Sequence, residues 1–109
     1  MENQALVVYC TCPDQGAAEY IAEAVVSERL AACVNLVPDV TSIYCWQGEI
    51  QRVAELLLII KTRRAVYPQL EARIIELHPY QVPEIIALPI QAGSAAYLDW
   101  IADNTGISA

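Results

Sequence analysis

The chain has 109 residues, a net charge of −7 and 56% apolar residues, which fits one domain, residues 1–109, with no room for a second. The acidic balance argues against nucleic acid and anionic membranes as partners. The apolar run at residues 5–10 is too short to span a membrane, and Glu2 replaces the basic flank of a signal peptide, so a cytoplasmic protein is expected. The surplus apolar residues are expected inside the domain or between subunits.

The first third of the chain predicts a strand followed by a helix. Residues 6–11 form a continuous apolar run that ends just before Pro13, which is typical of a buried central strand. Asp14 is a good N-cap, and apolar residues then recur at helical spacing. We therefore expect a helix over residues 15–30.

Residues 33–62 predict a long antiparallel hairpin. Two arms rich in β-branched and aromatic residues flank Gln47-Gly48, a two-residue turn in which Gly48 supplies a positive φ. In this register Trp46 faces Glu49, Tyr44 faces Gln51 and Ser42 faces Val53. Pro38 predicts a bulge or an edge position. The apolar run at residues 56–60 predicts a strand covered on both faces.

The length of this hairpin has a consequence for assembly. At roughly 3.3 Å per residue, one arm would span about 45 Å, whereas a compact domain of this size is about 34 Å across. The tip is expected to overhang its own core, yet it carries Tyr44, Trp46 and Ile50. An apolar overhanging ribbon is an aggregation hazard. We therefore expect these three residues to lie in a subunit interface of a homo-oligomer.

The last part of the chain predicts helix, strand and helix. Helical spacing over residues 65–78 places Pro68 in the first turn, and Pro79 stops the helix. Residues 85–90 form a short strand whose Pro89 indicates an edge or an end, and Gly93-Ser94 opens a final helix. The whole order predicts an α+β ferredoxin-like split βαβ fold (βαββαβ plus a C-terminal helix). The expected antiparallel strand order is 4-1-3-2, with one bare sheet face.

The most informative polar residues are those whose side chains can bind soft metal ions. The four cysteines are expected to be free thiols in a reducing cytosol. Cys10 and Cys12 share one strand face near a helix N-terminus, which lowers a thiol pKa and favours soft metals, although buried cysteines more often act as small apolar residues. His78, the sole histidine, is either a loop-stitching residue or a ligand, and Glu84 is either a ligand or a polar loop residue.

The basic residues allow two interpretations. Lys61, Arg63 and Arg64 form either a solvated rim or a small anion site beside the next helix N-terminus. No serine–histidine–acid set, glycine-rich phosphate loop or pair of catalytic carboxylates can be assembled from the sequence. No enzymatic activity is expected.

Several motifs together resemble those of the CutA family, whose members are named for tolerance of divalent cations. The residues that carry the resemblance span most of the chain: Thr11-x-Pro13, Leu30-Ala31-Ala32-Cys33-Val34-Asn35, Ser42-Ile43-Tyr44-x-Trp46-x-Gly48, Glu55 ahead of Lys61-Thr62, His78-Pro79-Tyr80-x-x-Pro83-Glu84-Ile85 and Tyr97-Leu98-x-Trp100-Ile101. The resemblance implies a homotrimer with an architecture similar to that of the PII signalling proteins.

The same resemblance implies a site that binds copper or another divalent metal ion. The matching positions here are Cys10 and His78, with Glu84 as a weaker candidate. Some relatives carry a second histidine at the position of Leu77, so this chain is expected to hold metal less tightly. The alternative is a PII-like trimeric scaffold or sensor that binds a small molecule or a protein partner between subunits. Its cleft would be lined by Lys61, Arg63, Arg64 and Tyr80.

Overall fold

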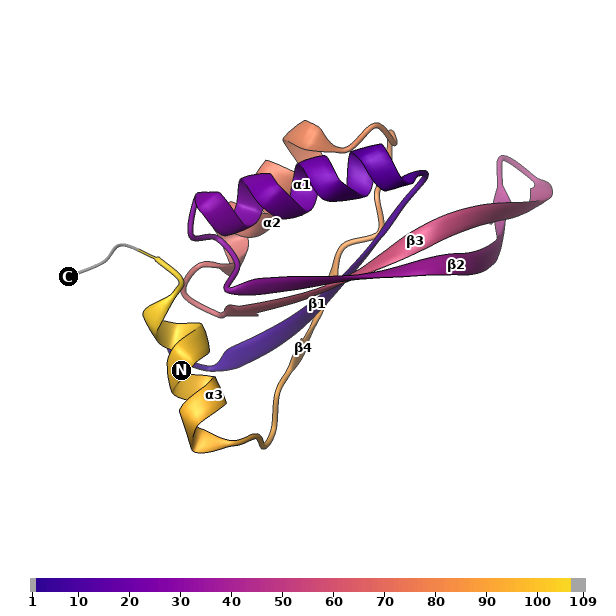
Figure 1. The fold of residues 1–109 in the computed structure, drawn as a ribbon. Helices are drawn as coiled ribbons and strands as arrows, with labels where there is room; N and C mark the ends of the chain where they lie inside the picture. Colours follow the sequence, from indigo (N-terminus) through magenta and orange to yellow (C-terminus); the bar gives the residue numbers. More distant parts are fainter. Residues whose placement is uncertain (1, 107–109) are drawn as a thin grey trace.

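The computed structural model describes residues 2–106 of the chain. Its elements follow one another as β1 (Ala5–Cys12), α1 (Gln15–Ser27), β2 (Cys33–Trp46), β3 (Glu49–Arg63), α2 (Tyr67–Leu77), β4 (Ile86–Pro89) and α3 (Ala95–Asp103) (Figure 1). The strands form one antiparallel sheet in the order β2-β3-β1-β4. The predicted ferredoxin-like fold and its strand order are confirmed.

The core lies between the sheet and the two helices α1 and α2, which both cover the same face (Figure 1). Alternate residues of β1 and β3 point into it, including Val8, Leu58 and Ile60, each with no exposed surface. Ile21 of α1 and Ile74 of α2 close it from above. Of the described helices, none is long and apolar enough to cross a membrane.

The hairpin has the predicted turn and register. Gln47 and Gly48 both have positive φ, 51° and 83°, as a tight two-residue hairpin turn requires. Trp46 pairs with Glu49, Tyr44 with Gln51 and Ser42 with Val53, as predicted. The register shifts between Val37 and Val40, which confirms the irregularity expected around Pro38.

The hairpin projects well beyond the helix-covered part of the sheet (Figure 1). The molecule measures 47 × 25 × 22 Å along its principal axes, so it is far longer than it is wide. Near the tip, Ile50 is 75% exposed and Trp46 is 40% exposed in the single chain. The overhang predicted from strand length is therefore present.

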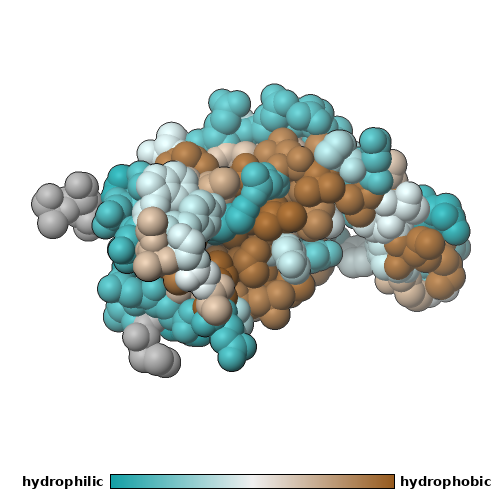
Figure 2. Space-filling model, turned by 60° about the horizontal axis from the view of Figure 1, so that its bottom comes forward, coloured by the Kyte–Doolittle hydropathy of each residue, from teal (hydrophilic) through white to brown (hydrophobic). Residues whose placement is uncertain are grey.

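The sheet face away from α1 and α2 is only partly covered. Val7, Tyr9, Leu57 and Ile59 are half-buried there, in alternation with fully buried neighbours. Figure 2 shows an apolar surface that extends over this side of the molecule. Within one chain, the prediction that residues 56–60 are covered on both faces is therefore wrong, because both main helices pack on the same side.

Helix α1 ends at Ser27, three residues before the predicted end at Leu30. Arg29 adopts a left-handed conformation with φ 62°, which terminates the helix although its side chain is not glycine. The backbone N–H groups of Arg29 and Leu30 then bond to the carbonyls of Val26 and Val25 at 3.0 and 2.9 Å. The Arg29 side chain also donates to the Gly106 and Asp103 carbonyls, both at 2.6 Å, which compensates for the strained backbone.

Candidate functional site

Three soft donors meet at the end of β1 on the helix-covered side of the sheet. Cys10 and Cys12 share one face of β1 because strand residues alternate, and His78 caps the C-terminus of α2 above them. Their ligand atoms all lie within 4.8 Å of one another, and all three side chains are buried. The structure thus brings together the predicted pair, Cys10 and His78, and adds Cys12.

Both ring nitrogens of His78 already have hydrogen-bond partners. Nδ1 accepts from the backbone N–H of Tyr80 at 3.1 Å, which leaves Nε2–H to donate to the Thr11 carbonyl at 2.7 Å. These contacts fix the orientation of the imidazole ring and join the loop after α2 to β1. Of the alternatives left open by the sequence, the loop-stitching role is present, and metal binding would require one of these hydrogen bonds to break.

The two thiols influence each other strongly. The pKa of Cys10 is raised by its hydrogen bond with Cys12, then by burial and by the nearby carboxylates of Glu84 and Glu55. The pKa of Cys12 is lowered by the same hydrogen bond, against the opposing effect of burial. The sequence-based prediction of a lowered pKa is therefore wrong for Cys10, because the pair favours one thiolate rather than two.

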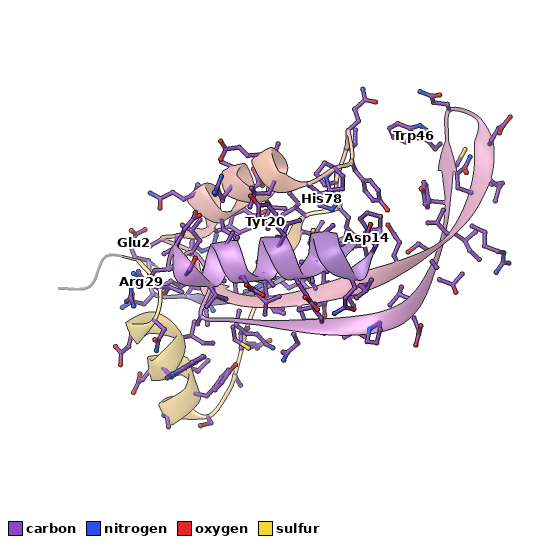
Figure 3. All side chains as sticks on the ribbon, turned by 45° about the horizontal axis from the view of Figure 1, so that its top comes forward. Glu2, Asp14, Tyr20, Arg29, Trp46 and His78 are labelled. Carbon is purple, nitrogen blue, oxygen red and sulfur yellow. The ribbon has the colours of Figure 1, made fainter. Side chains whose placement is uncertain are left out.

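A cleft separates the hairpin from the loop that follows α2. Its volume is about 670 Å³, and its walls come from the end of β1, the outer half of the hairpin and residues 79–84. Figure 3 shows Trp46 directed from the hairpin tip toward this loop, with His78 near the base of the loop. The lining residues are Thr11, Ser42, Ile43, Tyr44, Trp46, Glu55, Pro79, Tyr80, Gln81, Val82 and Glu84.

Glu55 is a buried carboxylate at the edge of this cleft, with 5% of its surface exposed. The Tyr80 hydroxyl donates to its Oε2 at 2.5 Å. Burial and then this hydrogen bond raise the pKa of Tyr80, so the phenol stays protonated and remains a donor. Glu55 was not among the site residues predicted from the sequence. The available signal was a charge placed directly before the apolar run at residues 56–60.

The remaining predicted ligand residues lie apart. Lys61 and Arg63 pair with Val7 and Ala5 at the start of β1, whereas Tyr80 lies near its end. Lys61 donates to Asn35, and Arg63 donates to the Thr105 hydroxyl at 2.9 Å and to its carbonyl at 3.1 Å. Within one chain these cations do not face the cleft.

The other predicted site residues divide between two surfaces. Arg64 and Glu84 are exposed, and Glu84 lines the cleft rather than joining the thiol cluster. Tyr44 and Trp46 also line the cleft, from one face of the hairpin. Ile50 pairs with Cys45 and therefore lies on the opposite face of the ribbon. The three residues predicted for one interface thus occupy both faces.

Comparison with known proteins identifies the family. The family model of the CutA1 divalent ion tolerance protein matches residues 6–104. The divalent-cation tolerance protein CutA of Thermus thermophilus is 56% identical over 100 residues, which cover 92% of this chain and 97% of that protein. The human protein CutA is 47% identical over 97 residues, covering 89% of this chain but 54% of its own length. The chain therefore spans about half of the human relative.

Solved structures of relatives share the fold. A divalent cation tolerance protein from Thermus thermophilus superposes with a TM-score of 0.92 at 55% identity, covering 94% of this chain and 99% of the other. A CutA from Archaeoglobus fulgidus, described as a periplasmic divalent cation tolerance protein, gives a TM-score of 0.89 at 35% identity, with 92% and 97% covered. The chain belongs to the CutA family of divalent-cation tolerance proteins.

Proposed function

We propose that this protein contributes to divalent-cation tolerance by binding a soft transition-metal ion, copper before zinc, through Cys10, Cys12 and His78. The observation that carries the proposal is the convergence of their three donor atoms within 4.8 Å. Thiolates and imidazole are the ligands that copper and zinc prefer, whereas magnesium and calcium require oxygen ligands. The donor set therefore fits copper. The proposal includes no catalytic step, because the family is named for tolerance of ions and not for a reaction.

Binding at this site is expected to be of moderate strength and to involve local rearrangement. The lone pair of His78 Nδ1 accepts the Tyr80 N–H, and Nε2–H bonds to Thr11, so a metal must replace one of these contacts. The buried thiols must also lose protons, so affinity should fall as the pH is lowered. Glu84, the weaker candidate from the sequence, is exposed and is not among the three clustered donors.

The proposal includes a homotrimer as the functional unit. Two observations support self-association: the overhanging hairpin with Ile50 on its outer face, and the half-buried apolar residues on the sheet face opposite the helices. Large exposed apolar surfaces commonly mark interaction sites. A reducing cytosol is the compartment that suits this unit, since all four cysteines are free.

Isothermal titration with copper under anaerobic conditions tests the metal site. We expect Cys10→Ser, Cys12→Ser and His78→Ala each to weaken copper binding at least about tenfold, because losing one of few ligands removes much of the coordination energy. Cys45→Ser is the matched control, since this thiol is exposed at the hairpin tip and far from the cluster along the chain. It should bind copper like the wild type.

Two outcomes would contradict the metal proposal. If all three variants retain wild-type affinity, then copper binds elsewhere. If Cys45→Ser alone reduces binding, then the exposed thiol accounts for it. The titrant is copper(I) and oxygen is excluded, because copper(II) itself oxidises thiols and oxygen would convert copper(I) back to copper(II). The heat of that oxidation would otherwise be read as binding.

A further inference from the structure

We propose that the cleft between the hairpin and the 79–84 loop binds a small organic cation that carries an ammonium group. This site shares none of its side chains with the cluster of Cys10, Cys12 and His78, so it does not depend on the metal proposal. Its volume of about 670 Å³ falls within the range of about 300–1,000 Å³ that is usual for small-molecule pockets. The side chains that line the cleft favour a cation.

Glu55 supplies the charge. It is 5% exposed, and among the described residues its one hydrogen-bond donor is the Tyr80 hydroxyl, which contacts Oε2. No buried and unsatisfied side-chain oxygen remains in the described chain, so the second oxygen of Glu55 must reach solvent, and Glu55 lines the cleft. A largely buried carboxylate with a free acceptor oxygen is stabilised by a cationic partner.

Aromatic side chains form the surrounding walls. Tyr44 and Trp46 lie two residues apart on one hairpin face, and Tyr80 faces them from the loop. Figure 3 shows the Trp46 side chain extending into the space between these segments. Aromatic faces attract ammonium groups through their negative electrostatic potential, and such groups are often bound by several aromatic rings together.

The charges around the cleft disfavour an anion. Its lining includes two carboxylates, from Glu55 and Glu84, and no lysine or arginine. The chain as a whole carries a net charge of −7, which attracts cations toward an acidic cleft. A bare metal ion is also a poor fit here, because no third carboxylate, thiol or imidazole joins these two among the described residues.

The two faces of the hairpin can serve both proposals at once. Tyr44 and Trp46 face the cleft, whereas Ile50 lies on the other face and remains available to a second copy of the chain. Ligand binding therefore does not require the hairpin face that carries Ile50 to be free. It requires only that the face that carries Tyr44 and Trp46 stay open in the assembled protein.

Titration of the full-length protein with choline tests this site. Tryptophan fluorescence of a Trp100→Phe variant isolates Trp46, and calorimetry provides an independent readout. We expect choline to bind at least about tenfold more tightly than its uncharged analogue, in which carbon replaces nitrogen, because both the carboxylate and the aromatic faces favour the charged form. Inorganic phosphate should not compete.

Matched variants locate the binding. Glu55→Gln should weaken choline binding about tenfold, and Trp46→Leu should weaken it several-fold. Glu23→Gln removes the same charge from an exposed position on α1 that does not line the cleft, so it should bind choline normally. If Glu55→Gln fails to fold, Glu84→Gln, at an exposed position, replaces it in the comparison.

Three results would overturn the proposal. They are no saturable choline binding, equal binding of choline and its uncharged analogue, or an equal loss in Glu23→Gln and Glu55→Gln. None of these results bears on copper binding, which is measured separately with the thiol variants.

Discussion

Both halves of β3 pair with β2, but only the inner half, residues 56–63, also pairs with β1, and the surroundings of the two halves differ greatly. From Leu56 onward, alternate side chains are fully buried beneath α1 and α2, whereas residues 49–54 form a ribbon that projects beyond the helices. Both halves are rich in apolar and β-branched residues. The difference teaches that pairing with one neighbouring strand does not build a core. A second neighbouring strand and the helices on one sheet face bury the inner half.

Substitution of one apolar residue in each half gives the largest expected effect. Leu58→Ala removes a side chain with no exposed surface and should lower the free energy of unfolding by about 2–5 kcal/mol, because it leaves a cavity. Ile50→Ala changes a side chain that is 75% exposed in one chain. It should nevertheless cost more than the roughly 0.5 kcal/mol of an ordinary surface change, because another copy covers Ile50 in the proposed trimer. Denaturant unfolding measures both.

An Ile50→Ala cost within about 0.5 kcal/mol of zero would contradict this comparison. The hairpin tip would then be solvated in the assembled protein. The outer half of β3 would then be a strand exposed to solvent, and only the inner half would contribute to a buried core.

Two glycines with positive φ provide a second and smaller comparison. Gly48 at the tip has φ 83° and open space around it, so Gly48→Ala should cost only the strain of a left-handed residue, roughly 1–2 kcal/mol. Gly106 has φ 78°, and an added Cβ would lie 2.4 Å from Nη2 of Arg63. Gly106→Ala should therefore cost more, since it also disturbs the Arg63 contacts with Thr105. Equal melting temperatures for the two variants would argue against the contact.

The smallest expected effect is a loss of stability at alkaline pH in the helix-covered half. Tyr67 donates to Glu71 Oε2 at 2.8 Å, and burial, followed by this hydrogen bond, raises the pKa of Tyr67 from 10.0 to about 12. The folded state thus favours the neutral phenol, so this contribution is fully present below pH 10.0 and is lost as the pH rises toward about 12. Thermal melts across this range should show a shallower decline for Tyr67→Phe than for the wild type.

Local patterns predicted most of the fold. The turn at Gln47-Gly48, the cross-strand pairs near it and the irregularity near Pro38 all follow from φ preferences and the missing proline N–H, which act over a few residues. The end of α1 was not predictable in this way. Arg29 takes a conformation that usually favours glycine, and contacts with residues 103–106, distant in sequence, hold it there.

The candidate site was only partly predictable for the same reason. Strand alternation places Cys10 and Cys12 together, and their contact with His78 depends on where α2 ends above β1. The cleft depends on how a curved hairpin and a loop approach each other in space, which no spacing in the sequence encodes. Lys61 and Arg63 were grouped with Tyr80 by chemistry, but the sheet register sets them at opposite ends of β1.

The claim that other copies of the chain cover the overhanging hairpin can be tested directly by analytical ultracentrifugation of the wild-type protein at micromolar concentration. The account predicts a single species with three times the chain mass of 12.0 kDa. A well-folded species near 12.0 kDa would contradict it, because the apolar tip and the bare sheet face would then be stable in water without a partner.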